Sequence, residues 1–397
     1  MTDPEQVPPA LTIRLVDAIG AVGAQEWDAC LAGSPGGDDN PFLSHRFLSI
    51  LEQSGSVGGD TGWDPRHLTV RDAAGLLLAV MPLYLKYHSY GEYVFDHGWA
   101  DAFERAGGRY YPKLQSSVPF TPVTGPRLLV RAGAPPGLPA TLIRALEGIA
   151  GESGLSGVHV TFAAPADVDC FRRAGWLLRL GTQFHWENRG YRGFDDFLAS
   201  LSSRKRKAVR KERQAVAYSG VELLTLTGGD LREEHWAAFD RLYRATSDRK
   251  WGQPYLTRDF FLRLGADMAD NAVLVMAREG GRWIGGALNL MGARTLYGRN
   301  WGGVGDHPFL HFEACYYRAI DFAIDHGLSR VEGGAQGEHK IQRGYLPVET
   351  WSAHYLVHPG LRRAVADFLA REREAMGDHI ADLAAAGPYR RAGDGPI

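Results

Sequence analysis

Residues Val273–Trp301 read VLVMAREGGRWIGGALNLMGARTLYGRNW, and this stretch decides the fold that the sequence predicts. An apolar run reaches a charged turn with glycines, a second run follows, and after another turn a third run ends at Trp301, which is typical of a three-strand antiparallel meander. Residues His67–Trp99, HLTVRDAAGLLLAVMPLYLKYHSYGEYVFDHGW, follow the same plan. The chain therefore contains two similar β-rich segments, the first of them followed by an insertion rich in aromatic residues, Pro and Gly (Ala100–Arg127).

A second pair of segments supports a duplication. CFRRAGWLLRLGTQFHW (Cys170–Trp186) aligns with KIQRGYLPVETWSAHY (Lys340–Tyr355), and a constant offset of 169 relates Gly175 to Gly344, Trp176 to Tyr345 and His185 to His354. We therefore expect an α/β (α+β) fold of two similar lobes, residues 1–190 and 191–397, each a mixed sheet flanked by helices. Trp176 and Tyr345 are expected at equivalent strand starts.

Bulk properties describe a soluble globular chain of 397 residues, 45% hydrophobic, with a net charge of −2. That charge excludes a protein that coats nucleic acid as a polycation, so any basic patch must be local. The three cysteines are far apart and lack CxxC spacing, so we expect neither disulfides nor a metal site. No apolar run reaches the roughly 20 residues of a membrane span, and the N-terminus does not resemble a signal peptide, so a cytoplasmic location is expected.

The segment between the lobes is predicted to be a basic helix over about 194–218. Seven of the ten residues Arg204–Arg213 are basic and surround most of the helix. Arginine in particular forms bidentate bonds to phosphate, so Arg204, Arg206, Arg210 and Lys211 are candidate ligands of an anionic substrate. The alternative is an ordinary solvated surface helix.

A glycine-rich segment of the second lobe, Gly333–Tyr345, combines more chemical groups than a connecting turn needs. Glu338 or His339 could take a proton from an attacking amine, and Lys340 could stabilise an oxyanion or hold a donor phosphate. These three are the catalytic candidates, and which of Glu338 and His339 is the base stays open. A solvated turn is the alternative interpretation.

Five long motifs together resemble the FemAB-like family of predicted N-acyltransferases, also described as peptidoglycan biosynthesis/recognition proteins: NPFLSHRFL (Asn40–Leu48), DHGWAD (Asp96–Asp101), YYPKLQSSVPFTPVTGPRLL (Tyr110–Leu129), FLHFEACYYRAIDFAI (Phe309–Ile324) and GAQGEHKIQRGYLP (Gly334–Pro347). The resemblance covers nearly the whole chain. It implies tandem GNAT-like lobes and a bacterial enzyme similar to those that add amino acids from aminoacyl-tRNA to a cell-wall precursor. The helix Leu201–Gln214 is similar to the Arg/Lys-rich helix that lies near substrate phosphates in such proteins.

The candidate substrate-binding residues outside the basic helix come from these motifs and from the strand end near Trp301. They are Asp96, His97, Trp99, Tyr111, Lys113, Arg299, Asn300, Trp301, Gln336, Arg343 and Tyr345.

The donor is the main open question. GNAT enzymes that use acyl-CoA hold pyrophosphate in an R/Q-x-x-G-x-G/A loop at a helix N-terminus. Here the loop Arg299–Pro308 has the glycines but places Asp306 and Pro308 before the helix. Aminoacyl-tRNA is therefore the favoured donor, with acyl-CoA as the alternative and no permanently bound cofactor.

Other function classes are less well supported. The HExxH, GxSxG and GxGxxG motifs of common hydrolases and dehydrogenases are absent from the sequence. A non-catalytic protein that binds RNA or a nucleotide-linked ligand is the competing hypothesis. The acceptor and the oligomeric state stay open.

Overall fold

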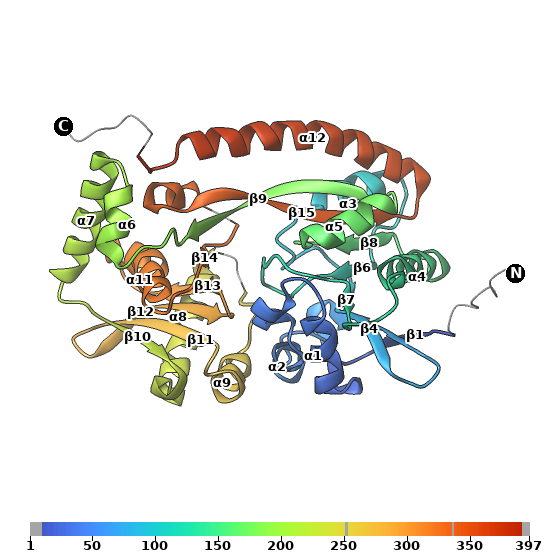
Figure 1. The fold of residues 1–397 in the computed structure, drawn as a ribbon, viewed down its shortest axis with the longest axis horizontal. Coiled ribbons are helices and arrows are strands. Elements are labelled where there is room, and N and C mark those ends of the chain that lie inside the picture. Colours follow the sequence, from blue (N-terminus) through green and yellow to red (C-terminus); the bar gives the residue numbers. More distant parts are fainter. Residues whose placement is uncertain (1–9, 251–252, 336, 391–397) are drawn as a thin grey trace, which may run out of the picture.

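The computed structural model describes residues 10–250, 253–335 and 337–390. Within these residues the strands form a four-stranded sheet, in the order β1-β3-β4-β7, and an eleven-stranded sheet, in the order β10-β11-β12-β13-β14-β9-β15-β8-β6-β5-β2. The larger sheet runs through both halves of the molecule (Figure 1). We refer to the residues before and after position 190 as the N-terminal and the C-terminal half; the placement of a domain boundary there stays a prediction.

The C-terminal half begins its sheet with the predicted meander, which is confirmed. The antiparallel strands are β10 (Glu222–Thr227), β11 (Ala272–Glu279), β12 (Arg282–Met291) and β13 (Thr295–Gly303). Gly280 and Gly281 connect β11 to β12 with positive φ angles of 54° and 77°. Glycine adopts this backbone region without steric cost, which explains the tight hairpin.

The helical connection after β13 returns the chain to the sheet. It comprises α10 (Leu310–Phe312), a π-helical turn (Glu313–Tyr317) and α11 (Arg318–Asp325). Strand β14 (Arg330–Glu332) then pairs in parallel with β13.

The N-terminal half departs from the predicted meander at its third strand. β3 (His67–Arg71) pairs with β4 (Leu77–Met81) as expected, and β5 (Tyr84–Lys86) follows beyond Pro82. Trp99, however, lies on α3 (His97–Arg105), so the prediction of a third strand ending there is wrong. The next strand along the chain that pairs with β5 is β6 (Lys113–Ser116), and the insertion that separates the two copies lies before this strand instead of after it.

The remaining strands of the N-terminal half divide between the two sheets. β1 (Thr12–Val16) and β7 (Leu129–Val130) belong to the smaller sheet, and β2 (Trp63–Pro65) and β8 (Gly157–Val160) to the larger.

Two long strands join the halves. β9 (Leu177–Glu187) and β15 (Leu346–Leu356) pair antiparallel with each other, and each also pairs with a strand of the other half, β9 with β14 and β15 with β8. Trp176 and Tyr345 immediately precede β9 and β15. Gly181 pairs with Thr350, and these positions differ by the same offset of 169, so a pseudo-two-fold axis passes between them. The duplication is therefore visible in the register of this strand pair.

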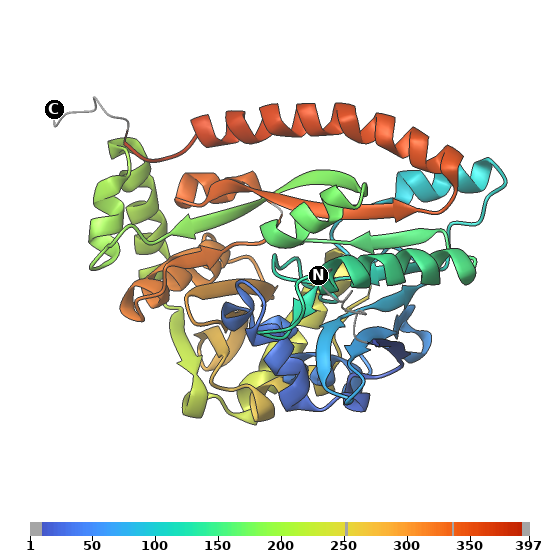
Figure 2. The same cartoon turned by 45° about the vertical axis from the view of Figure 1, so that its right-hand side comes forward.

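Helices cover both faces of the joined sheet. α12 (Pro359–Ala385) lies along β9 and β15 (Figure 2). Besides α3 and α11, the other helices of eight or more described residues outside the segment 191–220 are α1 (Ala24–Ala32), α2 (His45–Gln53), α4 (Leu138–Glu152), α5 (Pro165–Arg173), α8 (Glu233–Lys250) and α9 (Arg258–Asp267). No helix of the described residues is both long and apolar enough to cross a membrane.

The segment predicted as one basic helix forms two helices, α6 (Phe194–Ser200) and α7 (Ser203–Ala217). The break falls at Leu201, which is fully buried and forms a bridge with Tyr389. The backbone N–H of Ser202 donates to the carbonyl of Pro388. Contacts with the C-terminal segment thus end one helix and start the next.

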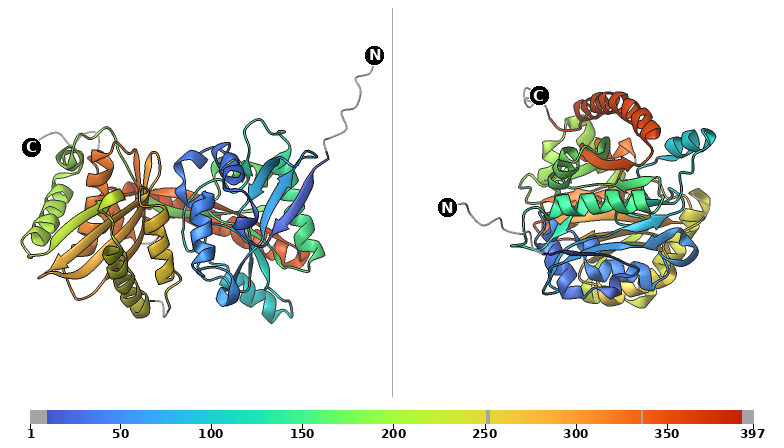
Figure 3. Two further views of the ribbon diagram at one scale, coloured as in Figure 1. Left: turned by 90° about the horizontal axis from the view of Figure 1, so that it is seen from below. Right: turned by 90° about the vertical axis from the view of Figure 1, so that its right-hand side faces the viewer.

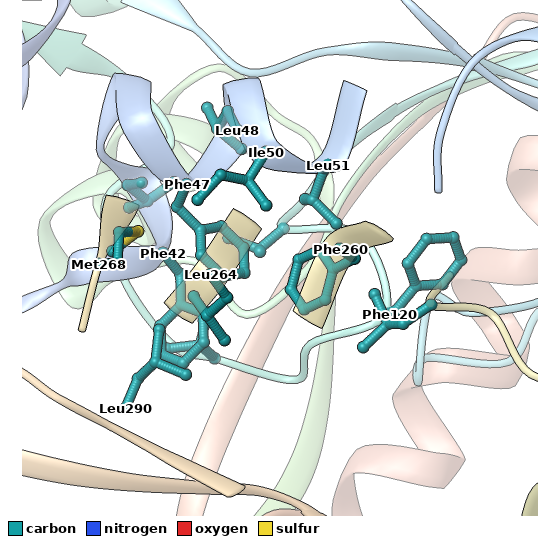
Figure 4. Close-up of a cluster of buried hydrophobic side chains, with 14 of the residues drawn as sticks. Phe42, Phe47, Leu48, Ile50, Leu51, Phe120, Phe260, Leu264, Met268 and Leu290 are labelled. Carbon is teal, nitrogen blue, oxygen red and sulfur yellow. The ribbon is translucent and has the colours of Figure 1, made fainter. Parts of the chain in front are cut away.

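An apolar core fixes the two halves against each other. The halves lie side by side and are crossed by the long strands (Figure 3). Below these strands α2 packs on α9, with Phe47 in edge contact with Phe260 at a centroid distance of 5.9 Å (Figure 4). Phe42 contacts Tyr297 of β13 in the same way at 5.3 Å. The space between the halves is therefore bounded by a rigid interface.

Candidate active site

A cavity of about 800 Å³ lies between the two halves. The N-terminal half contributes an aromatic wall that includes Tyr90, Tyr93 and Phe95, and the C-terminal half contributes residues of β12, β13, α8, the π-helical turn and the segment 333–340. This volume is typical of a small-molecule site.

The cavity opens where two parallel strands separate. β13 and β14 pair only as far as Tyr297 and Glu332. Beyond this point Gly333 donates to the carbonyl of Phe184 on β9, so its chain turns away from β13. The residues after the separation, Gly298–Trp301 on one side and Gly333–Ala335 on the other, line the cavity.

A β-bulge places Arg299 at this opening. Leu288 pairs with Asn300 and Asn289 with Gly298, so Arg299 has no partner on β12. A bulge reorients side chains and is common beside active sites. The predicted binding residues Arg299, Asn300 and Trp301 all line the cavity.

Lys340 is the most unusual polar residue of the cavity. It lines the wall yet is only 4% exposed. Its ammonium lies 5.5 Å from the centroid of the Phe184 ring, and no carboxylate of the described residues forms an ion pair with it. Burial lowers its pKa to about 8. A buried cation without a counter-ion is favourable only when a ligand or a transition state supplies negative charge.

His339 also lines the cavity, and its Nε2 is 2.9 Å from the hydroxyl oxygen of Tyr316. Tyr316 belongs to the π-helical turn, and burial raises the pKa of its hydroxyl. π-helical turns occur often at functional sites because they shift side chains out of the α-helical register. Here the turn presents Cys315 and Tyr316 to the same cavity.

Glu338 does not meet the expectation that it points into this cavity. It is absent from the described lining, its side chain is 67% exposed, and its nearest ionic contact is His379 of α12 at 4.0 Å. The reason is local: a 3-10 helix, Glu338–Arg343, turns neighbouring side chains about 120° apart, so His339 and Lys340 face inward while Glu338 faces α12. Its role as a base stays untested, and the geometry favours His339.

Arg343 and Tyr345 support the cavity wall from behind. Arg343 donates from Nη1 to the carbonyl of His339 at 2.7 Å, forms an ion pair with Glu212 of α7 at 2.8 Å and lies 3.4 Å from the centroid of the Phe312 ring. Tyr345 is fully buried and donates to the carbonyl of Tyr316. Neither residue is among the described lining residues, so their role in substrate binding stays a prediction. Gln336 lies outside the described residues.

The basic residues of α7 lie outside the cavity. Arg204, Arg210 and Lys211 are exposed, Arg206 is half-buried, and none of the four is among the described lining residues. Arg210 forms one exposed ion pair, with Asp195 at 3.5 Å. The Glu212–Arg343 ion pair nevertheless connects this helix to the wall that carries His339. The helix therefore presents its charge next to the cavity and not inside it.

Of the predicted binding residues in the N-terminal half, one lines the cavity and the others belong to a buried network. His97 lines the cavity. Lys113 is fully buried and forms ion pairs with Glu92 at 2.8 Å and Asp96 at 2.6 Å. Although burial opposes ionisation of Asp96, the charge of Lys113 and its hydrogen bond hold the pKa of this carboxyl below its usual value.

Tyr111 and Trp99 belong to the same interior network. The Tyr111 hydroxyl is 2.8 Å from that of Ser89, which also accepts a hydrogen bond from Lys113. Trp99 is buried and lies edge-on to His354. The structure therefore places Asp96, Trp99 and Lys113 in a structural core, with Tyr111 at its margin.

Backbone groups at the end of β13, before the loop, form hydrogen bonds within the protein. The N–H of Gly303 donates to Thr246 Oγ1 at 2.9 Å, and its carbonyl accepts from Arg249. Phe309, with a φ of 64°, precedes α10. No group of three or more His, Cys, Asp or Glu side chains in the part of the chain that the structure describes is placed to bind a metal ion.

Several cavity residues were not predicted from the sequence. Tyr90, Asn289, Cys315 and Tyr316 lie in the lining. Tyr90 belongs to an aromatic segment before β6. The sequence indicates an aromatic insertion only after Trp99, so Tyr90 falls outside it. The π-helical register that exposes Cys315 leaves no periodic signal in the sequence.

Comparison with known proteins agrees with this architecture. The model of the FemAB-like family, described as peptidoglycan biosynthesis/recognition, matches residues 18–391, so the chain belongs to this family. The structure is similar to that of FemX, with a TM-score of 0.55, 12% identity, and coverage of 87% of this chain and 98% of the other.

Two further solved structures are similar to this chain. L-PGS from Bacillus licheniformis gives a TM-score of 0.51 at 10% identity, with 86% of this chain and 98% of the other covered. The C-terminal domain of a putative lysylphosphatidylglycerol synthetase from Agrobacterium fabrum gives 0.52 at 10% identity, with 88% and 96% covered. No curated protein sequence matches the chain. The tandem GNAT-like fold is thus confirmed.

Proposed function

We propose that this member of the FemAB-like family is an acyltransferase that transfers an aminoacyl or acyl group from an activated ester or thioester to an amine. The observation that supports this most directly is the cavity at the separation of β13 and β14, where Lys340 is buried beside the opening without an ionic partner among the described residues. A GNAT-type fold with a polar cavity at this position is suited to holding a carbonyl and an amine together.

The proposed reaction is a direct displacement. The amine nitrogen attacks the donor carbonyl, a C–N bond forms, and the C–O or C–S bond to the leaving group breaks. His339, oriented by Tyr316, takes the proton that the nitrogen loses, and the leaving oxygen or sulfur is protonated in return. No covalent enzyme intermediate is needed.

Lys340 stabilises the negative charge that develops on the carbonyl oxygen. Because burial penalises its ammonium form, the cation gains most when an oxyanion appears beside it. With a pKa of about 8 it is mostly protonated at neutral pH. The ammonium is therefore available without further adjustment of the site.

Aminoacyl-tRNA is the favoured donor. The Gly303 N–H that a pyrophosphate would need is occupied by Thr246, and Asp306 adds negative charge before the helix. The exposed basic residues of α7 lie on the side of the wall that carries His339, where they suit a long polyanion better than a compact cofactor. The family description makes a peptidoglycan-precursor amine the favoured acceptor.

Single-turnover transfer tests this proposal. The protein would be mixed with a panel of aminoacyl-tRNAs and acyl-CoAs and with amine acceptors that include cell-wall precursors. Lys340→Met and His339→Ala should each reduce the transfer rate by roughly 100-fold with any productive donor. Arg241→Gln, an exposed arginine of α8 outside the cavity, is the matched control.

A second experiment distinguishes an RNA donor from a CoA donor. Arg206→Ala with Arg210→Ala should weaken an RNA donor and reduce the salt dependence of its KM, because each lost phosphate contact lowers that slope by about one. A CoA donor would be insensitive to these changes. Absence of transfer with the whole panel, together with salt-dependent RNA binding, would favour the non-catalytic RNA-binding alternative.

A further inference from the structure

The described residues that line the cavity include cationic side chains and no carboxylate. Among the described lining residues Arg299 and Lys340 are cationic, and there is neither Asp nor Glu. The residues 251, 252 and 336, which the structure does not describe, are Trp, Gly and Gln, so the sequence adds no acid at these positions. Lys340 therefore repels a positively charged ligand, whereas the charge of Arg299 is partly balanced by Glu332 at 3.4 Å.

Arg299 is incompletely satisfied within the protein. Its side chain is 4% exposed, Nη1 donates to the carbonyl of Gly298 at 2.8 Å, and Nη2 reaches Glu332 at 3.4 Å, while Nε has no partner. Glu332 is also 3.8 Å from His185. A buried guanidinium with an unused N–H costs free energy that a bound oxyanion offsets, and its planar fork matches carboxylate and phosphate groups.

The opposite wall is aromatic and accessible. Tyr90 is 58% and Phe95 49% exposed, and His97 stacks on Phe95 at a centroid distance of 5.9 Å. All three line the cavity and come from the segment between β5 and β6. Exposed aromatic faces of this kind bind the apolar faces of ligand rings.

We propose that the acceptor is a ring-containing amine that also carries a carboxylate or phosphate, with its oxyanion bound at Arg299 and its ring against Tyr90 and Phe95. The cavity consequently favours an anion over a cation of similar size. This inference rests on the proposed transfer function only in assigning the ligand as the acceptor, because binding itself needs no turnover.

Calorimetric binding of four small probes to the full chain tests the inference. Phenylacetate and phenyl phosphate represent the two oxyanions, benzyl alcohol is the neutral analogue, and phenethylamine is the cation. We expect at least one anion to bind at least 10-fold more tightly than phenethylamine, and the ratio between the two anions identifies the oxyanion. Arg299→Gln should weaken the anions at least 10-fold and leave benzyl alcohol within 2-fold, whereas Arg241→Gln should change neither.

Tyr90→Ala should weaken all neutral and anionic probes alike. If Arg299→Gln does not fold, as judged by its thermal transition, Arg299→Lys takes its place, because it keeps the charge but loses the fork and should weaken the anions about 3-fold or more. Two results would overturn the inference: equal affinities for phenethylamine and the anions, or anion affinities that neither Arg299 substitution changes. Anion binding without transfer to any acceptor would support the inference and argue against the proposed function instead.

Discussion

The two halves of the molecule contain comparable pairs of parallel strands, and only one pair opens. In the C-terminal half β13 and β14 separate after Tyr297 and Glu332, and the cavity begins there. In the N-terminal half β6 and β8 stay connected: Thr161 donates to the carbonyl of Ser116 at 3.1 Å, and Gly125 forms a bridge with Ala163. The same scaffold thus encloses a site on one side and a closed core on the other.

Both halves bury lysines, and the surroundings of Lys113 and Lys340 differ. Lys113 is fully buried with two carboxylates within 2.8 Å, whereas Lys340 lies near the Phe184 ring and has no ion pair with a carboxylate in the described part of the chain. A cation paired within the fold stabilises that fold, and a cation left unpaired at a cavity wall is available to a ligand. The number of ionic partners, more than the degree of burial, distinguishes Lys113 from Lys340.

The largest expected effect comes from the N-terminal lysine. Lys113→Met leaves Asp96 buried without its lysine and leaves Glu92 with only the more distant Lys86, at 3.9 Å, so the free energy of unfolding should fall by about 3–5 kcal/mol. Chemical denaturation measures this loss. The transfer rate per folded molecule should stay within about 2-fold of wild type, and a rate loss at full stability would place Lys113 in the active site after all.

Lys340→Met should lower activity and raise stability, the opposite of the effects expected for Lys113→Met. We expect kcat to fall by roughly 100-fold or more because the oxyanion loses its cation. Stability at pH 7 should rise, because a lysine whose pKa is lowered to about 8 in the fold opposes folding below that pH, and this penalty disappears as pH rises towards the unfolded pKa. Measurements of the transfer rate and of chemical denaturation on one preparation check the expected fall in kcat and the expected rise in stability. An unchanged kcat would remove Lys340 from the mechanism.

The pH dependence of the wild type sharpens this assignment. If the ammonium form of Lys340 is active, kcat should decrease as pH rises through about 8, by about 10-fold for each unit above that value. A rate that instead increases through pH 8 would identify Lys340 as the base. Lys340→Arg should move the fall to higher pH, because arginine stays protonated.

A smaller effect is expected from the connection between α7 and the cavity wall. Glu212→Gln removes the charge that pairs with Arg343, whose Nη1 holds the carbonyl of His339. A slight displacement of His339 should lower kcat by roughly 10-fold with little change in KM. Glu222→Gln, which alters an exposed ion pair with Arg278, serves as the control. An effect on KM alone would indicate that Glu212 acts through ligand binding.

The smallest effect is expected at Glu338. Its side chain is two-thirds exposed and only 4.0 Å from an exposed histidine, and such a pair contributes about 0–1 kcal/mol. Glu338→Gln should therefore leave both kcat and stability near wild type. A 100-fold loss of kcat would restore Glu338 as the base and require the segment around it to rearrange when substrate binds.

The amino-acid sequence by itself determined the parts of this protein that depend on local pattern. Alternating apolar runs and the Gly280–Gly281 turn predicted the meander of the C-terminal half, and the constant offset predicted the equivalence of Trp176 and Tyr345. Long motifs identified the family, and the glycine-rich segment contained His339 and Lys340, both of which line the cavity.

The tertiary structure decided what depends on contacts between distant residues. The third strand of the N-terminal meander is β6 because its hydrogen bonds with β5 and β8 outweigh the local resemblance of the Trp99 segment to a strand. Adjacent residues such as Glu338 and His339 have similar local signals, but the 3-10 helix between Gly337 and Gly344 directs them about 120° apart, so only His339 lines the cavity. Ionic partners likewise come from distant segments, which is why the roles of Lys113 and Lys340 could be distinguished only in the folded chain.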